Sequence, residues 1–279
     1  MRAIRMIAGL VTGAVLGANA MAEEAPSVLD RVLERGVLVA GIRQDNPPHS
    51  FINDAGEWVG FDVDIAQGIA DQMGVELERV LVDEITRISY LQIDRIDIAA
   101  ASMSHTWKRD EAVDFSQTYF WSAQTFLVLK DKVGKLDDLV GKPVGMSRGS
   151  HSVGNWKAWL ASGGHDVNGD HIVEFGDKQV AVNAVLAGKV HGWAEDAEVL
   201  ASYAAANPKL GVLSQEAIGM KQDGIGVKNN DSRMRDAVNR ALQNIESSGQ
   251  YDVIYNRWFG PESETPMPLT NRIEIWPEG

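Results

Sequence analysis

Apolar residues recur along the chain at two spacings, and the spacing predicts which segments are helices and which are strands. The stretch "FDVDIAQGIADQM" places an apolar residue at every fourth position from Phe61 to Met73 and is followed by Gly74, as in a helix with one buried face. The segments 37–42 and 97–102 are short apolar runs with little polar alternation. Such runs are typical of strands that are buried on both faces of a sheet.

Strands and helices alternate through two successive parts of the chain, which predicts α/β layers with a mainly parallel sheet in each of two lobes. The segment "NPPHSF" interrupts regular structure, because its two prolines disfavour helix and strand alike. Strands are expected at residues 37–42, 76–82, 97–102, 123–130, 143–147, 172–175, 190–195 and 224–228, and helices at residues 27–36, 61–73, 86–93, 136–141, 152–162, 177–188 and 232–248.

The first 22 residues have the pattern of an export signal. Arg2 and Arg5 precede an apolar segment at residues 7–18, and residues 20–22 read Ala-Met-Ala, which suits a cleavage site. The apolar segment has about 12 residues, whereas a membrane-spanning helix needs about 20. We therefore expect residues 1–22 to be removed on export and, provided that the source is a Gram-negative bacterium, the protein to be free in the periplasm rather than anchored in a membrane.

Composition limits the classes of partner and chemistry. The chain has 279 residues, 44% of them apolar and 23% charged, which is typical of a folded globular protein. Without Arg2 and Arg5, 24 basic residues face 39 acidic ones, so the net charge changes from −13 to −15 and nucleic acid is not an expected partner. The absence of cysteine excludes disulfides, thiolate chemistry and a lipid anchor at the cleavage site.

A group of polar residues follows the buried strand at residues 97–102. Ser102, Ser104 and Arg109 come where this strand ends. In open α/β sheets, ligands bind outside the carboxyl ends of the strands, and a guanidinium with hydroxyls beside it suits a carboxylate. A simpler interpretation of the same stretch is a helix capped by Thr106 with solvated charges behind it.

Four motifs carry a resemblance to a known family. "GFDVDIA", "MSHTWKRDEAVDFS", "GKPVGMSRGS" and "YDVIYNRWFG" occur in the order and at the spacing seen in family 3 extracellular solute-binding proteins, the polar amino acid receptors of ABC importers. The resemblance covers about residues 28–260 and implies a two-lobed periplasmic-binding-protein fold of type II, which closes on one amino acid. Lobe 1 is then expected at residues 28–125 and 222–260, lobe 2 at residues 130–217, and a C-terminal tail at residues 261–279.

The resemblance also implies which residues hold the ligand's α-carboxylate. The arginine that binds this group in the family matches Arg109, and the loop groups beside it match Ser102 and Ser104, where other members often carry Gly and Thr. The turn of lobe 2 that donates amides to the same carboxylate matches Gly149, Ser150, His151 and Ser152.

The aspartate that receives the α-ammonium in the family matches Asp196. Glu198 stands two residues later, where a proline is common, and the alternative for Asp196 is a surface carboxylate in front of a helix. A fixed cation and amides at one pole and a carboxylate at the other would leave neither charge of a zwitterion buried and unpaired.

The residues expected around the ligand side chain favour an anionic group. Arg43 stands where members that bind cationic amino acids tend to carry Asp, and Arg87 matches an arginine that resembles the side-chain ligand of glutamate/aspartate receptors. Glu84 either neutralises an arginine or receives an ammonium of the ligand. Glutamate or aspartate is therefore the favoured ligand, ahead of glutamine or asparagine, with basic or modified amino acids behind.

The apolar walls of the pocket are less clear in this chain than in its relatives. Asn46 and His49 replace aromatic residues that often enclose the ligand, which leaves Phe51 and Trp58 as candidate walls. Arg148, beside a turn, either adds positive charge to the pocket or is solvated.

Two further functions are compatible with such a fold. Cyclohexadienyl dehydratases are related enzymes, and Asp45, Glu84, Glu195 and Asp196 supply carboxylates, but their spacing selects no acid/base role. No HExxH or phosphate-loop motif is present. A ligand sensor for a membrane kinase would close in the same way. The expected partners are an amino acid and an ABC permease, with the protein as a monomer and without a cofactor or metal.

Overall fold

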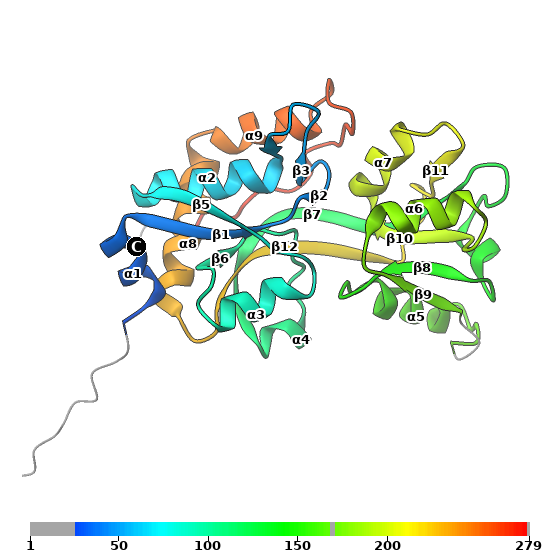
Figure 1. Ribbon diagram of the computed structural model, residues 1–279, viewed down its shortest axis with the longest axis horizontal. Helices are drawn as coiled ribbons and strands as arrows, with labels where there is room; N and C mark the ends of the chain where they lie inside the picture. Colours follow the sequence, from blue (N-terminus) through cyan, green and yellow to red (C-terminus); the bar gives the residue numbers. More distant parts are fainter. Residues whose placement is uncertain (1–25, 168–170, 278–279) are drawn as a thin grey trace, which may run out of the picture.

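A mixed sheet runs the length of the molecule in the computed structural model, which describes residues 26–167 and 171–277 (Figure 1). Helices cover both faces of the sheet in two lobes. Among the described residues its strands are, from edge to edge, β5 (Glu76–Leu81), β1 (Val37–Ile42), β6 (Ile98–Ala99), β12 (Gly219–Lys228), β7 (Val113–Leu129), β10 (Gly192–Asp196), β8 (Val144–Ser147) and β9 (Ile172–Phe175), with β11 (Leu210–Val212) paired to β7.

The first lobe packs helices on both faces of the parallel strands β5, β1 and β6. Ile65 and Ile69, four residues apart on one helix, are fully buried in a core shared with Val238 and Leu242. A small sheet of β2 (Asp45–Asn46), β3 (Ser50–Ile52) and β4 (Trp58–Val59) lies beside this core. The helices of this lobe are α1 (Val28–Arg35), α2 (Phe61–Met73), α3 (Thr86–Gln92), α4 (Trp107–Asp110), α8 (Ser232–Ser247) and α9 (Gln250–Phe259).

The second lobe has two cores because its sheet is also covered on both faces. Phe126 packs against Trp156 on one face, with ring centroids 5.1 Å apart, whereas the next residue, Leu127, belongs to the core around Trp193 on the other. Side chains of successive strand residues point to opposite faces, which explains this division. The helices are η1 (Leu136–Leu139, a 3₁₀ helix), α5 (Ser152–Ser162), α6 (Lys178–Leu186) and α7 (Ala197–Ala205).

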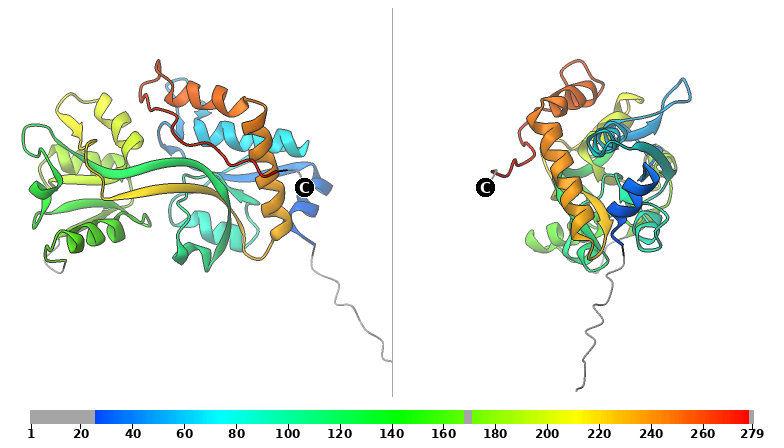
Figure 2. Two further views of the ribbon diagram at one scale, coloured as in Figure 1. Left: turned by 180° about the vertical axis from the view of Figure 1, so that it is seen from behind. Right: turned by 90° about the vertical axis from the view of Figure 1, so that its left-hand side faces the viewer.

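Two long antiparallel strands, β7 and β12, lie side by side and connect the lobes (Figure 2). The predicted strands at residues 123–130 and 224–228 are parts of them, but polar residues such as Asp114 and Gln117 conceal the first half of β7 from a hydrophobic pattern. The expected changes of lobe therefore fall in or beside continuous strands rather than in loops. Helix α9 was not predicted either, and α4 and α7 were considered only in the alternative interpretations of the stretch at Thr106 and of Asp196. The expected α/β fold of type II is confirmed.

The two ends of the chain differ in what the structure describes. The expected export signal at residues 1–22 lies outside the described residues. Residues 261–277 form neither helix nor strand and run over the first lobe, where Ile273 is buried and Arg272 pairs with Glu246 at 2.6 Å (Figure 2). Between residues 26 and 277, leaving aside 168–170, no helix has the length and hydrophobicity to cross a membrane.

A buried histidine joins the lobes. His49, between β2 and β3, has its Nε2 atom 2.9 Å from Oε1 of Glu198 at the start of α7, and its Nδ1 atom 3.5 Å from Oδ1 of Asp62 in α2. All three side chains are buried. Burial alone would lower the pKa of His49, but hydrogen bonds and charges of the two carboxylates outweigh it and raise this pKa to about 9. The imidazolium thus holds the two lobes together at neutral pH.

The contacts of His49 with Glu198 and Asp62 make the stability of the unliganded protein depend on pH. Because the pKa of His49 is raised, its contribution is complete below pH 6.5 and is lost as pH rises towards 9. We expect His49→Gln to lower the free energy of unfolding by on the order of 3 kcal/mol at pH 6 and by much less at pH 9.5. Urea unfolding at both pH values measures this, with the exposed His105→Gln as control; equal losses at both pH values would contradict the assignment.

The turn just before α2 passes close to the backbone of His49 and requires glycine at position 60. Gly60 has φ 137°, and a Cβ atom there would lie well under 3.0 Å from backbone atoms of His49 and Ser50. Gly60→Ala should therefore lower the free energy of unfolding by about 3 kcal/mol or more. Gly56→Ala is the control, because Gly56 has φ 78° with no atom within 4 Å of the added Cβ, and should cost about 1 kcal/mol. Similar losses in urea unfolding would show that the close approach is unimportant.

Candidate functional site

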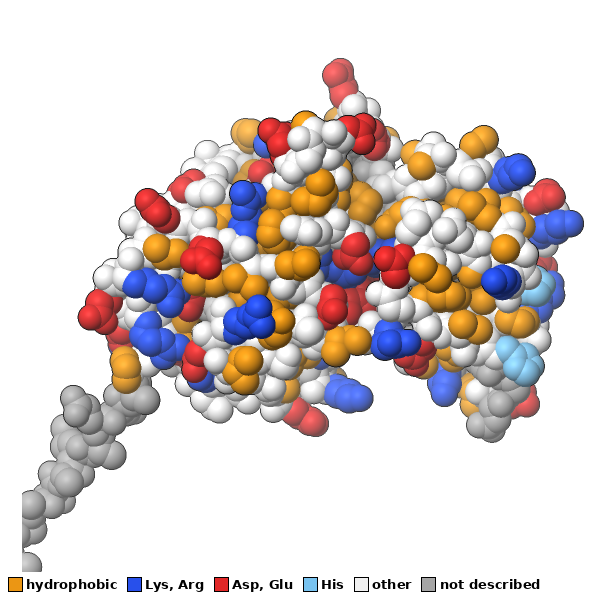
Figure 3. Space-filling view, viewed as in Figure 1, with side chains coloured by type: hydrophobic (Ala, Val, Ile, Leu, Met, Phe, Trp, Pro, Cys, Tyr) orange, Lys and Arg blue, Asp and Glu red, His pale blue; other side chains and the backbone are white. Residues whose placement is uncertain are grey.

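A cavity between the lobes collects nine of the residues that the sequence analysis expected around a ligand. It lies at the carboxyl ends of β1 and β6, where ligands of open α/β sheets bind. Figure 3 shows acidic and basic side chains gathered where the lobes meet. The residues around the cavity are Arg43, Glu84, Arg87, Ser102, Ser104, Arg109, Gln124, Ser150, His151, Glu195, Asp196 and Lys221.

The polar stretch after β6 has both features considered from its sequence. Thr106 caps α4, and its hydroxyl accepts a hydrogen bond from the Arg109 amide. The side chain of Arg109 nevertheless turns into the cavity, where Nη1 donates to the Ser104 carbonyl at 2.9 Å and Nη2 to the Gly149 carbonyl of the second lobe at 3.1 Å. The two interpretations are thus compatible, because the cap fixes the backbone of Arg109 while its side chain lines the cavity.

Two guanidiniums of the cavity have no carboxylate partner among the described residues. Arg109 is 9% exposed and Arg87 only 2%. Arg87 donates through Nη1 to the Ala101 carbonyl at 2.7 Å, and its Nε has no partner within the described part of the chain. Burial, followed by repulsion from Arg109, lowers the pKa of Arg87 to about 9, and burial also lowers that of Arg109. The cavity therefore favours an anionic group.

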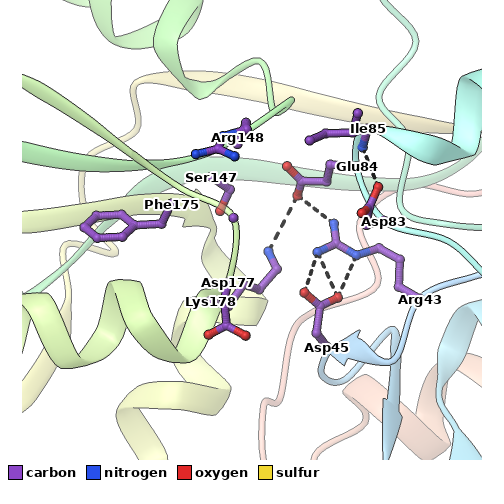
Figure 4. A pocket seen from close by; sticks show the side chains of 11 residues that line it. Arg43, Asp45, Asp83, Glu84, Ile85, Ser147, Arg148, Phe175, Asp177 and Lys178 are labelled. Carbon is purple, nitrogen blue, oxygen red and sulfur yellow. Dashed lines mark hydrogen bonds and ion pairs between the residues drawn. The ribbon is translucent and has the colours of Figure 1, made fainter.

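Arg43, in contrast, is neutralised by the protein itself. Its guanidinium pairs with Asp45 at 2.9 Å and with Oε1 of Glu84 at 2.6 Å (Figure 4). Two roles were considered for Glu84 from the sequence. Its Oε1 has the first of them, because it neutralises Arg43. Arg43, which was expected beside Arg87 at the ligand side chain, lines the cavity, but its charge is already balanced by carboxylates of the protein.

Asp196 is not the surface carboxylate that was the alternative interpretation. It ends β10 and is 4% exposed. Its Oδ1 accepts from Gln124 Nε2 at 3.1 Å, and its Oδ2 pairs with Nζ of Lys221, which also lies 2.8 Å from Oδ2 of Asp223. One ammonium thus meets two carboxylates, which leaves a negative charge at this end of the cavity.

Sequence reasoning found Asp196 but missed the other two residues of this ion group. Lys221 and Asp223 alternate along β12, and both are buried. The strand was expected to begin only at Gly224, so these residues fell outside it. Burial and, against the attraction of Lys221, the charge of Asp196 raise the pKa of Asp223 to about 6.

Two residues of the predicted turn of the second lobe, Ser150 and His151, line the cavity. The His151 ring lies against the first lobe, with Nδ1 3.3 Å from Ser104 Oγ, and burial lowers its pKa to about 4. Ser150 lines the cavity, and its hydroxyl accepts from the Ser152 amide at 3.3 Å. Ser152 itself is fully buried at the start of α5 and is not part of the lining.

The two candidate apolar walls lie elsewhere. Phe51 packs edge-on against Trp258, with ring centroids 5.8 Å apart, and is not part of the lining. Trp58 donates from Nε1 to the Arg43 carbonyl at 2.6 Å and so supports the backbone of that residue. The cavity is lined by polar and charged groups, and among the described residues no group of histidine and carboxylate side chains is arranged to hold a metal ion.

Several known proteins are similar to this chain over most of its length. The L-cystine-binding protein TcyJ of Escherichia coli K12 is 26% identical over 260 residues, which cover 92% of this chain and 94% of that protein. The glutamine-binding protein GlnH of an ABC transporter of Bacillus subtilis is 30% identical over 248 residues, 86% of this chain and 87% of that protein. The crystal structure of a mutant of ArgBP from T. maritima superimposes with a TM-score of 0.75 at 31% identity, and covers 83% of this chain and 99% of that one.

The family model of the bacterial extracellular solute-binding proteins, family 3, matches residues 38–261. This match includes both lobes and all residues around the cavity, and it confirms the resemblance carried by the four motifs. The chain therefore belongs to the family 3 bacterial extracellular solute-binding proteins.

Proposed function

We propose that this protein captures an acidic amino acid between its lobes in the periplasm and delivers it to an ABC permease. The observation that carries the proposal is the pair of buried guanidiniums, Arg87 and Arg109, which line one cavity without a carboxylate partner in the described residues. A molecule with two carboxylates would balance both. Glutamate and aspartate have this chemistry.

The α-carboxylate of the ligand binds Arg109 in this proposal. Ser104 contributes a hydroxyl from the first lobe, and the turn at residues 149–152 contributes polar groups from the second. Hydrogen bonds between charged groups are worth about 1.5 to 3 kcal/mol each, so a guanidinium with two or three further donors supplies much of the roughly 8 kcal/mol that micromolar binding requires.

The α-ammonium binds Asp196, which lines the cavity, with Asp223 buried behind Lys221. These two carboxylates share Lys221, and each carboxylate has about four acceptor positions. The ammonium therefore adds to the ion group without displacing Lys221. The second carboxylate of the ligand binds Arg87, on the same side of the cavity as Ser102.

The relatives support an amino acid as the ligand and a role in transport. The names of two of them state binding of cystine and of glutamine, and one is named as part of an ABC transporter. Closure of the lobes would then present the loaded form to a permease, because the ligand stabilises the closed state by contacting both lobes.

Replacement of Arg109 tests the carboxylate site. We expect Arg109→Ala to weaken binding of glutamate or aspartate about 100-fold or more. The melting temperature of the empty protein should change by less than about 3 °C, because the substitution also removes repulsion between Arg109 and Arg87. Calorimetric titration and thermal unfolding measure both, with Lys108→Ala, an exposed neighbour, as the control. Retained affinity together with a large loss of stability would support a capping role alone.

The affinity should also depend on pH through Asp223. Its pKa of about 6 must fall when an ammonium binds next to it. Affinity is therefore expected to decrease as pH is lowered through 6, because protonated Asp223 no longer balances the ammonium. Titrations at pH 8 and pH 5 should differ for the wild type and agree more closely for Asp223→Asn. An affinity independent of pH in the wild type would show that the ammonium binds elsewhere.

A further inference from the structure

A second cavity adjoins the first and extends away from Arg109 between the same two lobes. The cavities share Arg43 and Glu84. The second lies between the loop at residues 83–85 of the first lobe and two segments of the second lobe, 147–148 and 175–178 (Figure 4). A ligand longer than glutamate would reach it from the first cavity, past Glu84.

One oxygen of Glu84 is buried without a partner. The side chain is 8% exposed, and Oε1 is held by Arg43 and lies 3.8 Å from Lys178 Nζ. Oε2 has no hydrogen-bond partner within the described residues. Figure 4 shows Oε2 pointing away from Arg43 and Lys178, to the side of the cavity where Ser147 and Arg148 lie. A buried ionised oxygen without a donor is unfavourable, so this position calls for an N–H group.

Glu84 is ionised at neutral pH. Burial alone would raise its pKa, but the charges of Arg43, Lys178 and Arg87 outweigh burial and lower this pKa to about 2. The unpartnered oxygen therefore carries negative charge, and a cationic donor matches it better than a neutral one.

The other carboxylates of the second cavity already have structural roles. Asp83 accepts hydrogen bonds from the amides of Ile85 and Thr86 at the start of α3. Asp177 caps α6 by accepting from the Val180 amide at 2.8 Å. Asp45 pairs with Arg43 at 2.9 Å. Glu84 is thus the carboxylate of this cavity that remains open to a ligand.

The charges repeat at the two ends of the combined cavity. Arg43 meets two carboxylates, Asp45 and Glu84, as Lys221 meets Asp196 and Asp223. Each group leaves one negative charge, Lys178 and Glu195 pair with each other and add no net charge, and the two unpaired guanidiniums provide two positive charges. Glutamate, with one ammonium, would leave the charge at Glu84 unmatched.

We propose that the preferred ligand is a diamino dicarboxylic acid, whose second ammonium binds Oε2 of Glu84 while its second carboxylate binds Arg87. This inference rests on the proposed function and specifies its ligand. The two carboxylates and two ammoniums of such a molecule match all four positions. Glu84 then determines specificity, since it distinguishes a ligand with a second ammonium from an ordinary acidic amino acid.

Matched pairs of ligands test the proposal directly. The pairs are 2,5-diaminoadipate and 2-aminoadipate, 2,6-diaminopimelate and 2-aminopimelate, and 2,7-diaminosuberate and 2-aminosuberate, which differ only in the second ammonium. In calorimetric titrations of the wild type, the diamino member of at least one pair should bind about tenfold tighter than its partner. In Glu84→Gln the ratio should fall to within about threefold, whereas Glu78→Gln, an exposed change on β5, should keep it.

The outcomes separate this inference from the proposed function. If glutamate or the monoamino compounds bind as tightly as the diamino compounds in every pair, the inference is wrong and the proposed function stands. A preference for diamino compounds that persists in Glu84→Gln also contradicts it. Absence of binding by all of these compounds, glutamate and aspartate included, overturns both. Should Glu84→Gln not fold, the ratios of the wild type alone decide.

Discussion

Two buried guanidiniums, those of Arg87 and Arg109, face one cavity without a carboxylate partner in the part of the chain that the structure describes. Burial of unpaired charge is costly, so this arrangement is reasonable only if a ligand completes it. The neighbouring cations Arg43 and Lys221 are in the opposite situation, because each meets two carboxylates. The cleft thus holds separated excesses of both signs, which suits a small molecule with several charges.

The long strands β7 and β12 make this arrangement possible. They pass through both lobes as one antiparallel pair, and they carry Gln124 and Lys221 to the floor of the cavity. The lobes contribute the other groups from opposite sides. The buried pair of His49 and Glu198 holds the lobes together away from the cavity, so the empty protein has a contact of its own that favours closure.

Much of the fold follows from local patterns in the sequence. Helix α2 was predicted because its apolar residues are spaced for one face and Gly74 ends it with φ 71°. The first half of β7 was not, because Asp114 and Gln117 interrupt its apolar pattern in a strand whose neighbours supply the burial. Family motifs placed Arg109 and Asp196 at the cavity, but the same approach put Phe51 there, and it packs on Trp258 instead.

The ion pairs across the cavity could not be predicted from the sequence, for a physical reason. They join residues that are far apart along the chain, such as Glu84 with Lys178 in the other lobe, and no local pattern encodes such a pair. His49 and Glu198 are instructive, since each departs from the family pattern by itself and only the fold shows that they contact each other. Sequence reasoning therefore predicts where strands end and which charged residues follow them. Which of these charges neutralise one another can be seen only in the structure.

A crystal structure of the protein with an acidic or diamino dicarboxylic amino acid bound tests the central claim most directly. The account predicts one ligand carboxylate within hydrogen-bond distance of Arg109 and a second within that distance of Arg87, with an ammonium beside Asp196. A ligand whose carboxylates contact neither guanidinium, or a bound form in which Arg87 and Arg109 pair with carboxylates of the protein, would contradict it.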